Sequence, residues 1–285
     1  MTPAPLPAAK SAGAFLLLFL AVAGLYSQRV VSLAPGLTEI AFAIDRGGSL
    51  VGVTKFCDYP QAAREIDKIG GFLDISMEAL VALAPDIVLA YPEHADRLKS
   101  LPSQVRVVTV RHDRLFELLR SIAEIGQALN AQKEARRLQG AIRDRLQRVA
   151  RSVRGKRRVS TLCVAGRNAD ELKNMFIIGR NDFLNDLLEI AGGTNAYKGS
   201  IDYPNISLES VIALEPEFIL EISSHYEGIS DERIFALWQT LGMIPAVARQ
   251  QVRVIKDASW LRPGPRVGRV AEELAALLHG SGRLP

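Results

Sequence analysis

Two stretches of the chain share one pattern of apolar and polar positions. Residues 75–89 are ISMEALVALAPDIVL and residues 206–220 are ISLESVIALEPEFIL, an offset of 131 residues with seven identical positions. Each copy starts with a Ser suited to cap a helix, then a Glu in the first turn, where the helix dipole favours negative charge. An apolar stripe, a terminating Pro and a short apolar run predict a helix followed by a strand buried on both faces. Solenoid units are about 20–50 residues long, so this repeat indicates two similar lobes instead.

The rest of the pattern alternates short apolar runs with amphipathic segments. In the first half we expect strands at residues 29–33, 49–53 and 105–110 and a helix at 37–45. In the second half we expect strands at 158–164 and 252–255 and helices at 181–191, 231–241 and 266–278. Such alternation predicts, in each lobe, a parallel sheet flanked by helices.

Residues 115–153 contain no proline, and Leu138, Ile142, Leu146 and Val149 recur at helical spacing. They predict one long helix between the lobes. Its opposite face is rich in arginine, which is compatible with nucleic acid or a membrane. Because such charge runs are usually solvated, we interpret it as the solvent side of a connecting helix. The chain thus divides into a leading segment (1–27), a first α/β lobe (28–113), the connecting helix (114–155) and a second α/β lobe (156–285).

The leading segment predicts a signal peptide. Lys10 precedes an apolar core at residues 12–25, and residues 21–23 form an A-x-A-like cleavage site. The core is short for a membrane span, which needs about 20 residues. We therefore expect an exported protein, with an uncleaved N-terminal anchor as the alternative.

Composition narrows the class of protein. The 285 residues are 48% hydrophobic and 23% charged, which suits two globular domains. The net charge is only +4, and no basic–aromatic motif supports nucleic-acid binding. Cys57 and Cys163 fall in different lobes and form no CxxC, so they predict neither a disulfide framework nor a zinc site, although their redox state stays open.

The cleft between the lobes is the expected ligand site, because parallel α/β sheets bind ligands beyond the carboxyl ends of their strands. Aromatic residues gather at these ends and favour a large flat ligand, since ligand pockets are mostly apolar with a few polar groups. Taken singly, each is more often a core residue. The candidates are Phe56, Tyr59, Phe72, Tyr91, Phe176, Tyr203 and Trp260.

Two pairs of residues follow the repeat. Glu78 and Glu209 begin the repeated helices, which we expect at the cleft-side edge, and they are either docking charges or ordinary first-turn glutamates. His94 and His225 are also 131 residues apart, after the repeated strand. Imidazole is a common metal ligand, so they are candidates for holding a metal or a haem iron, with surface histidines as the alternative.

No motif for catalysis is present: the chain lacks GxSxG, HExxH, a P-loop and GxGxxG after a strand. The histidines at 94, 112, 225 and 279 have no acidic partner at a telling spacing. We therefore expect a binding protein and no enzymatic activity. The alternative is a periplasmic enzyme or metal-chelate chaperone that uses Cys57, a residue that otherwise fits a small buried position.

Several segments resemble one known family. Residues 29–44 (RVVSLAPGLTEIAFAI), 51–60 (VGVTKFCDYP), 70–90, 176–197 and 260–267 (WLRPGPRV) are similar to the periplasmic substrate-binding proteins of ABC transporters for cobalamin, iron–siderophores and haem. The resemblance covers about residues 30–280. It implies two lobes joined by a single backbone helix, a monomer in the periplasm, and permease subunits as partners.

Within that family the chain most resembles the cobalamin-binding proteins. The resemblance implies that Glu78 and Glu209 form salt bridges with permease arginines. It also implies that cobalamin (vitamin B12) contacts Phe56, Phe72, Tyr91, Phe176, Tyr203 and Arg262. The chain departs from the pattern where Asp257 comes early and Ala258 stands at the expected acidic position. Haem or a ferric siderophore is the alternative ligand.

Overall fold

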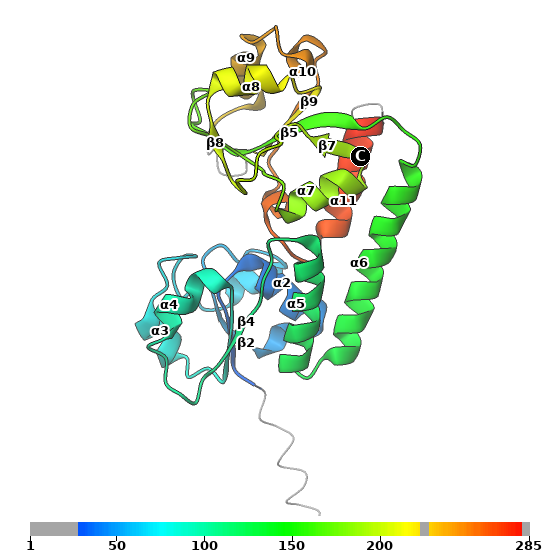
Figure 1. The fold of residues 1–285 in the computed structure, drawn as a ribbon. Coiled ribbons are helices and arrows are strands. Elements are labelled where there is room, and N and C mark those ends of the chain that lie inside the picture. Colours follow the sequence, from blue (N-terminus) through cyan, green and yellow to red (C-terminus); the bar gives the residue numbers. More distant parts are fainter. Residues whose placement is uncertain (1–27, 223–227, 281–285) are drawn as a thin grey trace, which may run out of the picture.

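The computed structural model describes residues 28–222 and 228–280. Two lobes lie one above the other in Figure 1, and helix α6 runs beside both of them. The expected signal peptide (1–27) and His225 lie outside the described residues. Within the described ranges, no helix combines the length and the apolar character needed to cross a membrane.

The first lobe contains a four-stranded parallel sheet in the order β2-β1-β3-β4, as the alternating pattern predicts. Helices and short 3-10 turns connect the strands on both faces, which is the arrangement expected of parallel strands joined by crossovers. The elements are β1 (Val30–Ser32), α2 (Pro35–Ala43), η1 (Gly47–Ser49), β2 (Leu50–Val53), η2 (Gln61–Glu65), α3 (Met77–Ala82), β3 (Ile87–Ala90), η3 (Pro92–His94), α4 (Ala95–Leu98) and β4 (Arg106–Thr109).

The second lobe has a mixed sheet in the order β10-β9-β5-β6-β8, with β7 also paired to β5. Strands β7, β9 and β10 form parallel pairs, but β6 pairs antiparallel with both β5 and β8. The prediction of a wholly parallel sheet is wrong here, because β6 follows β5 after only a short loop and such connections join antiparallel strands. The elements are β5 (Val159–Gly166), β6 (Met175–Ile177), α7 (Phe183–Ile190), β7 (Gly193–Asn195), β8 (Asn205–Ile206), α8 (Leu208–Leu214), β9 (Phe218–Ile222), α9 (Asp231–Gln239), α10 (Pro245–Ala248), β10 (Val252–Ile255), η4 (Ala258–Leu261) and α11 (Val267–His279).

The repeated stretch forms the same unit in both lobes. Ser76 Oγ accepts the N–H of Ala79 (3.2 Å) and Ser207 Oγ accepts the N–H of Ser210 (3.3 Å), so both serines are N-caps. The strands that follow, β3 and β9, are buried along their whole length and lie inside their sheets. The predicted helix–strand unit is therefore confirmed in each copy.

The connecting segment contains two helices instead of the expected one. Helix α5 (Leu115–Ala128) runs antiparallel to α6 (Gln132–Ser152), as Figure 1 shows. The turn between them has a positive φ at Asn130 (53°). The Arg46 side chain of the first lobe holds this turn by donating to the carbonyl oxygens of Leu129 (2.9 Å) and Asn130 (2.7 Å).

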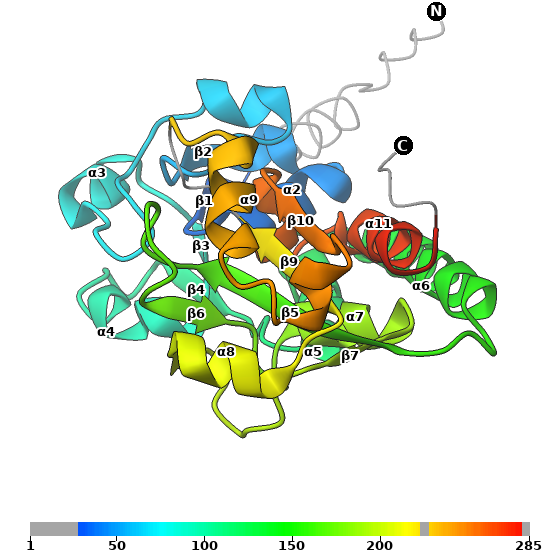
Figure 2. The same cartoon turned by 90° about the horizontal axis from the view of Figure 1, so that it is seen from above.

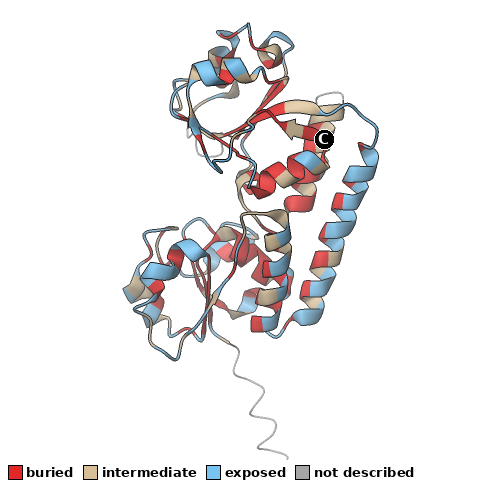
Figure 3. Ribbon diagram, viewed as in Figure 1, coloured by how far each residue is buried: buried red, intermediate tan, exposed pale blue. Residues whose placement is uncertain are grey.

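A single hydrophobic core runs through both lobes on the α6 side. It includes Leu37 of α2, Leu118 of α5, Val149 of α6, Leu187 of α7 and Leu274 of α11, all buried. Figure 2 shows α11 and α6 side by side, and in Figure 3 the buried segments gather where these helices meet. Each lobe has a further core of its own. The two lobes therefore share packed side chains as well as a connecting helix.

Candidate functional site

Among the described residues, three ion pairs join the second lobe to the first lobe or to the start of the connecting segment. They are Arg114–Asp186 (2.6 Å), Arg262–Asp58 (2.6 Å) and Arg266–Glu39 (2.8 Å). The first links the start of α5 to α7, and the other two link the loop between β10 and α11 to the first lobe. All are hydrogen-bonded, and Arg–carboxylate pairs of this kind are among the stronger polar contacts in proteins.

Of the three pairs, Arg266–Glu39 lies nearest the predicted aromatic residues and is the least exposed to solvent. Burial raises the pKa of Glu39 above its usual value, more than the neighbouring Arg266 lowers it. The guanidinium of Arg266 also lies 4.4 Å from the centre of the Tyr59 ring, which is a cation–π contact. Tyr59 is thus held at the boundary by a residue of the opposite lobe.

Four of the predicted aromatic residues expose about half of their surface. Two come from the first lobe, and two come from the second. The exposed fractions are 46% for Phe56, 50% for Tyr59, 47% for Phe176 and 53% for Tyr203. Tyr203 donates its hydroxyl hydrogen to the carboxylate of Asp182, which begins the same helix that carries Asp186. One ring from each lobe, Tyr59 and Tyr203, is therefore anchored to a residue of the interlobe ion pairs or of the helix that carries one.

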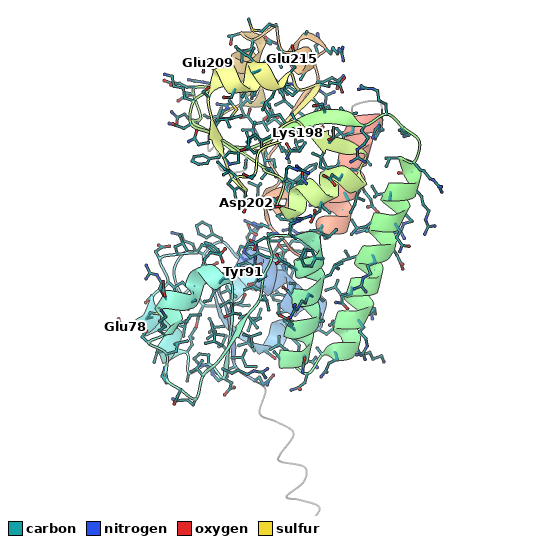
Figure 4. All side chains as sticks on the ribbon, in the orientation of Figure 1. Glu78, Tyr91, Lys198, Asp202, Glu209 and Glu215 are labelled. Atoms are coloured by element: carbon teal, nitrogen blue, oxygen red, sulfur yellow. The ribbon has the colours of Figure 1, made fainter. Side chains whose placement is uncertain are left out.

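Tyr91 and Phe72 lie deeper than expected. Tyr91 is buried, and Figure 4 shows it at the part of the first lobe that faces the second. Its hydroxyl has no hydrogen-bond partner among the described residues. Burial raises the pKa of Tyr91 well above its usual value. Phe72 is partly buried and meets the ring of His94 edge-on, with 4.8 Å between centres.

His94 is a structural residue in this arrangement, against the expectation that it holds a metal. It is fully buried, the N–H of Tyr91 donates to its Nδ1 (3.0 Å), and its Nε2 donates to the carbonyl oxygen of Phe72 (3.0 Å). Burial lowers the pKa of His94, more than its hydrogen bonds raise it. Neither ring nitrogen is free for a metal, because the loop after β3 folds the imidazole inward.

Trp260 lies deeper than expected of a ligand contact. Its indole is buried, and its N–H donates to Glu273 of α11 (3.1 Å). Arg262, the predicted polar contact, remains at the boundary but is engaged by Asp58. Asp257 binds Arg269 (2.6 Å) within its own lobe. Burial opposes ionisation of Asp257, but hydrogen bonds from Arg269 and Ser259 lower its pKa to about 2.

Glu78 and Glu209 are both exposed in the first turns of α3 and α8. Figure 4 places them on the side of the molecule away from α6, one on each lobe. A hydrogen bond with Ser207 lowers the pKa of Glu209. Their carboxylates are thus available to a second protein that spans both lobes.

The two cysteines are buried free thiols. Cys57 accepts a hydrogen bond from Thr38 (3.1 Å), and burial raises the pKa of Cys163 to about 12. Cysteines buried in this way are generally inert. This environment fits the interpretation of Cys57 as a small buried residue.

The structure also brings together residues that sequence reasoning left apart. His112 lies near Glu93 and Asp113, and one donor atom from each is within 4.8 Å of the others. Asp113 is adjacent in sequence, but Glu93 follows a different strand. The signal that was available is the parallel sheet expected for the first lobe, since residues that follow neighbouring parallel strands meet at one sheet edge.

Proteins similar in sequence cover most of the chain. The vitamin B12-binding protein of Vibrio campbellii is 27% identical over 247 residues, which is 84% of this chain and 85% of the relative. An uncharacterized ABC transporter substrate-binding lipoprotein of Bacillus subtilis is 27% identical over 268 residues, which is 88% of this chain and 80% of the relative.

Solved structures share the fold. The periplasmic haem-binding protein from Roseiflexus sp. RS-1, in apo form, matches with a TM-score of 0.77 at 23% identity and covers 90% of this chain and 100% of its own. The periplasmic vitamin B12-binding protein of Vibrio cholerae matches with a TM-score of 0.74 at 23% identity, covering 88% and 96%.

A family model matches residues 30–258, from β1 in the first lobe to the loop after β10 in the second, and it describes periplasmic binding proteins. The expected two-lobed α/β architecture is confirmed over the same span. The chain therefore belongs to the periplasmic binding protein family.

Proposed function

We propose that this protein is an exported, non-catalytic binding protein that captures a corrinoid, most simply cobalamin, between its lobes. The carrying observation is the set of four half-exposed aromatic rings, two from each lobe, of which Tyr59 contacts Arg266 and Tyr203 contacts Asp182 near the interlobe ion pairs. Aromatic rings supply large rigid apolar contacts for a flat macrocycle, and the nearby charged groups suit its polar periphery. The relatives named vitamin B12-binding proteins support this ligand class.

Haem is the second candidate, because solved haem-binding proteins share the fold. Haem iron is held by an axial side chain such as His or Tyr. With both nitrogens of His94 engaged, the axial ligand in this chain would be an exposed phenol such as Tyr59, or His225. A ferric siderophore would need no such ligand from the protein.

Delivery to an ABC importer is the second half of the proposal. Glu78 and Glu209 are exposed on separate lobes, away from α6. Carboxylates in this position are suited to bidentate pairs with arginines of permease subunits. One pair per lobe would fix the orientation of a monomeric binding protein on a two-subunit transporter.

The ligand is tested by titrating the purified protein with cyanocobalamin, hemin and a ferric siderophore in a calorimeter. We expect cobalamin to bind at micromolar concentration or below. Replacing Phe56 or Tyr203 with Ala should then weaken binding about tenfold, as loss of an aromatic contact costs roughly 1 kcal/mol or more. Met243→Ala is the matched control, because Met243 is 69% exposed on the far end of the second lobe, between α9 and α10.

Absence of cobalamin binding at micromolar concentration would reject the corrinoid. Tight hemin binding that is lost in Tyr59→Phe, with its absorbance band shifted, would establish haem instead. An equal loss of affinity in Met243→Ala would show that the aromatic set has no special part in binding.

A further inference from the structure

Three residues of metal-binding type meet at the edge of the first lobe's sheet. Glu93 follows β3, and His112 and Asp113 follow β4, the neighbouring strand. Because β3 and β4 are parallel, their carboxyl ends deliver these side chains to the same place. One donor atom from each lies within 4.8 Å of the other two.

His112 is held rigidly with an unsatisfied nitrogen. Its ring packs on Tyr91, with 3.8 Å between ring centres. Its Nε2 is buried and has no hydrogen-bond partner among the described residues, while Glu93 Oε1 lies 3.6 Å away. That gap is too long for a hydrogen bond. It is close to the roughly 3.3 Å that separates two donors sharing a tetrahedral zinc ion, given metal–ligand distances of about 2.0–2.1 Å.

The charges around His112 favour a cation. Arg111 donates to Asp113 Oδ2 (2.8 Å) and to Glu117 Oε1 (2.6 Å), so one guanidinium serves two carboxylates. Asp113 Oδ1 lies 3.9 Å from Nδ1, whereas Glu93 faces the other ring nitrogen, and one donor atom of each of the three residues is within 4.8 Å of the other two. Glu93 forms no other ion pair within residues 28–222 and 228–280. Carboxylates therefore outnumber cationic groups in the cluster.

The cluster also lies at the boundary with the second lobe. Arg114, the residue after Asp113, pairs with Asp186 of α7. The pKa values of Asp182 and Tyr203 are raised mainly by burial, and the charge of Asp113 contributes to both. Asp113 therefore adjoins a residue that pairs across the boundary.

We propose that Glu93, His112 and Asp113 form a binding site for a divalent transition-metal ion such as Zn²⁺. One imidazole nitrogen with two carboxylate oxygens suits Zn²⁺, whereas Mg²⁺ and Ca²⁺ take oxygen ligands. Exposed Glu93 supplies the movable ligand that closes on the ion, and His112 supplies the fixed one. Three protein ligands leave a coordination position for water or for a donor atom of a transported ligand. The site needs no corrinoid, so it does not depend on the proposed cargo.

The test is a Zn²⁺ titration of untagged full-length protein, stripped with a chelator, in competition with a colorimetric zinc indicator. We expect one tightly held ion per chain. Glu93→Gln and His112→Gln should each weaken zinc binding by at least about tenfold, since even supporting residues of metal sites contribute 10–100-fold. Glu65→Gln and His279→Gln are matched controls that make the same substitutions outside the cluster, and they should bind like the wild type.

Thermal unfolding curves without zinc would verify that all four variants fold. Because Glu93 is exposed, Glu93→Gln retains the fold even if His112→Gln disturbs packing on Tyr91. Unchanged zinc affinity in Glu93→Gln, or an equal loss in His279→Gln, would overturn the assignment. So would displacement of zinc by an equal concentration of Mg²⁺.

Discussion

Replacing Asp182 with Asn removes one titrating group from the interlobe boundary and keeps a capping oxygen. Asp182 is the N-cap of α7, and its carboxylate accepts the N–H of Leu184 (2.7 Å) and the hydroxyl of Tyr203. Burial raises the pKa of Asp182 from 3.8 to about 6, more than these hydrogen bonds lower it. Compared with the unfolded chain, the folded protein therefore favours the protonated form of Asp182.

The magnitude follows from linkage. Between 3.8, the usual pKa, and about 6, the folded protein keeps a proton that the unfolded chain releases. Stability therefore falls as pH rises through this window, by about 1.4 kcal/mol per unit and about 3 kcal/mol in all, and is level above it. The Asn side chain does not ionise, so Asp182→Asn should lack this fall.

The assay is urea unfolding of wild type and variant from roughly pH 4 to pH 7.5. Subtracting the two curves cancels the contributions of distant groups to the pH dependence of stability. Glu39 is one such group, because its raised pKa also makes stability fall as pH rises. Tyr203→Phe removes a hydrogen bond that lowers the pKa of Asp182, so its fall should extend to higher pH. Parallel curves for wild type and Asp182→Asn would refute the reasoning.

Three further perturbations test other parts of the structure. Charge reversal at Glu78 and Glu209 should reduce transport with unchanged ligand affinity, and a fall in affinity would move these residues into the ligand site. Gly126→Ala would place a Cβ 2.4 Å from a Cβ of α6 and should lower the free energy of unfolding by about 1–3 kcal/mol. Gly140→Ala has open space around it and should stabilise the protein slightly. Equal melting temperatures for the two variants would contradict this expectation. His94→Gln should cost about 1–3 kcal/mol through a lost buried hydrogen bond, without changing zinc affinity in the indicator assay.

Local signals in the sequence predicted the local structure well. The serines at 76 and 207 cap their helices because the partner N–H groups lie three residues away, inside the motif itself. The short runs after Pro85 and Pro216 become buried strands because their side chains are apolar. Exposed positions such as Glu78 and Glu209 also follow from the helical pattern alone.

Features that depend on distant residues were missed. The break between α5 and α6 is fixed by Arg46, which lies in the first lobe, so the helical pattern of 115–153 gave no sign of it. Trp260 follows a strand like the other aromatic candidates, but its indole lies in the core, where its N–H donates to Glu273 of α11. The partner of His112 is Glu93, and only the pairing of two strands connects them.

The turn held by Arg46 makes α6 a lever. The helix has 21 residues, so it is about 30 Å long. A tilt of about 5° at its first residue moves its far end by roughly 3 Å at that length. The far end leads into β5, which lies inside the second lobe's sheet. A change at this turn, where one guanidinium holds two carbonyl groups, would therefore shift the second lobe relative to the first.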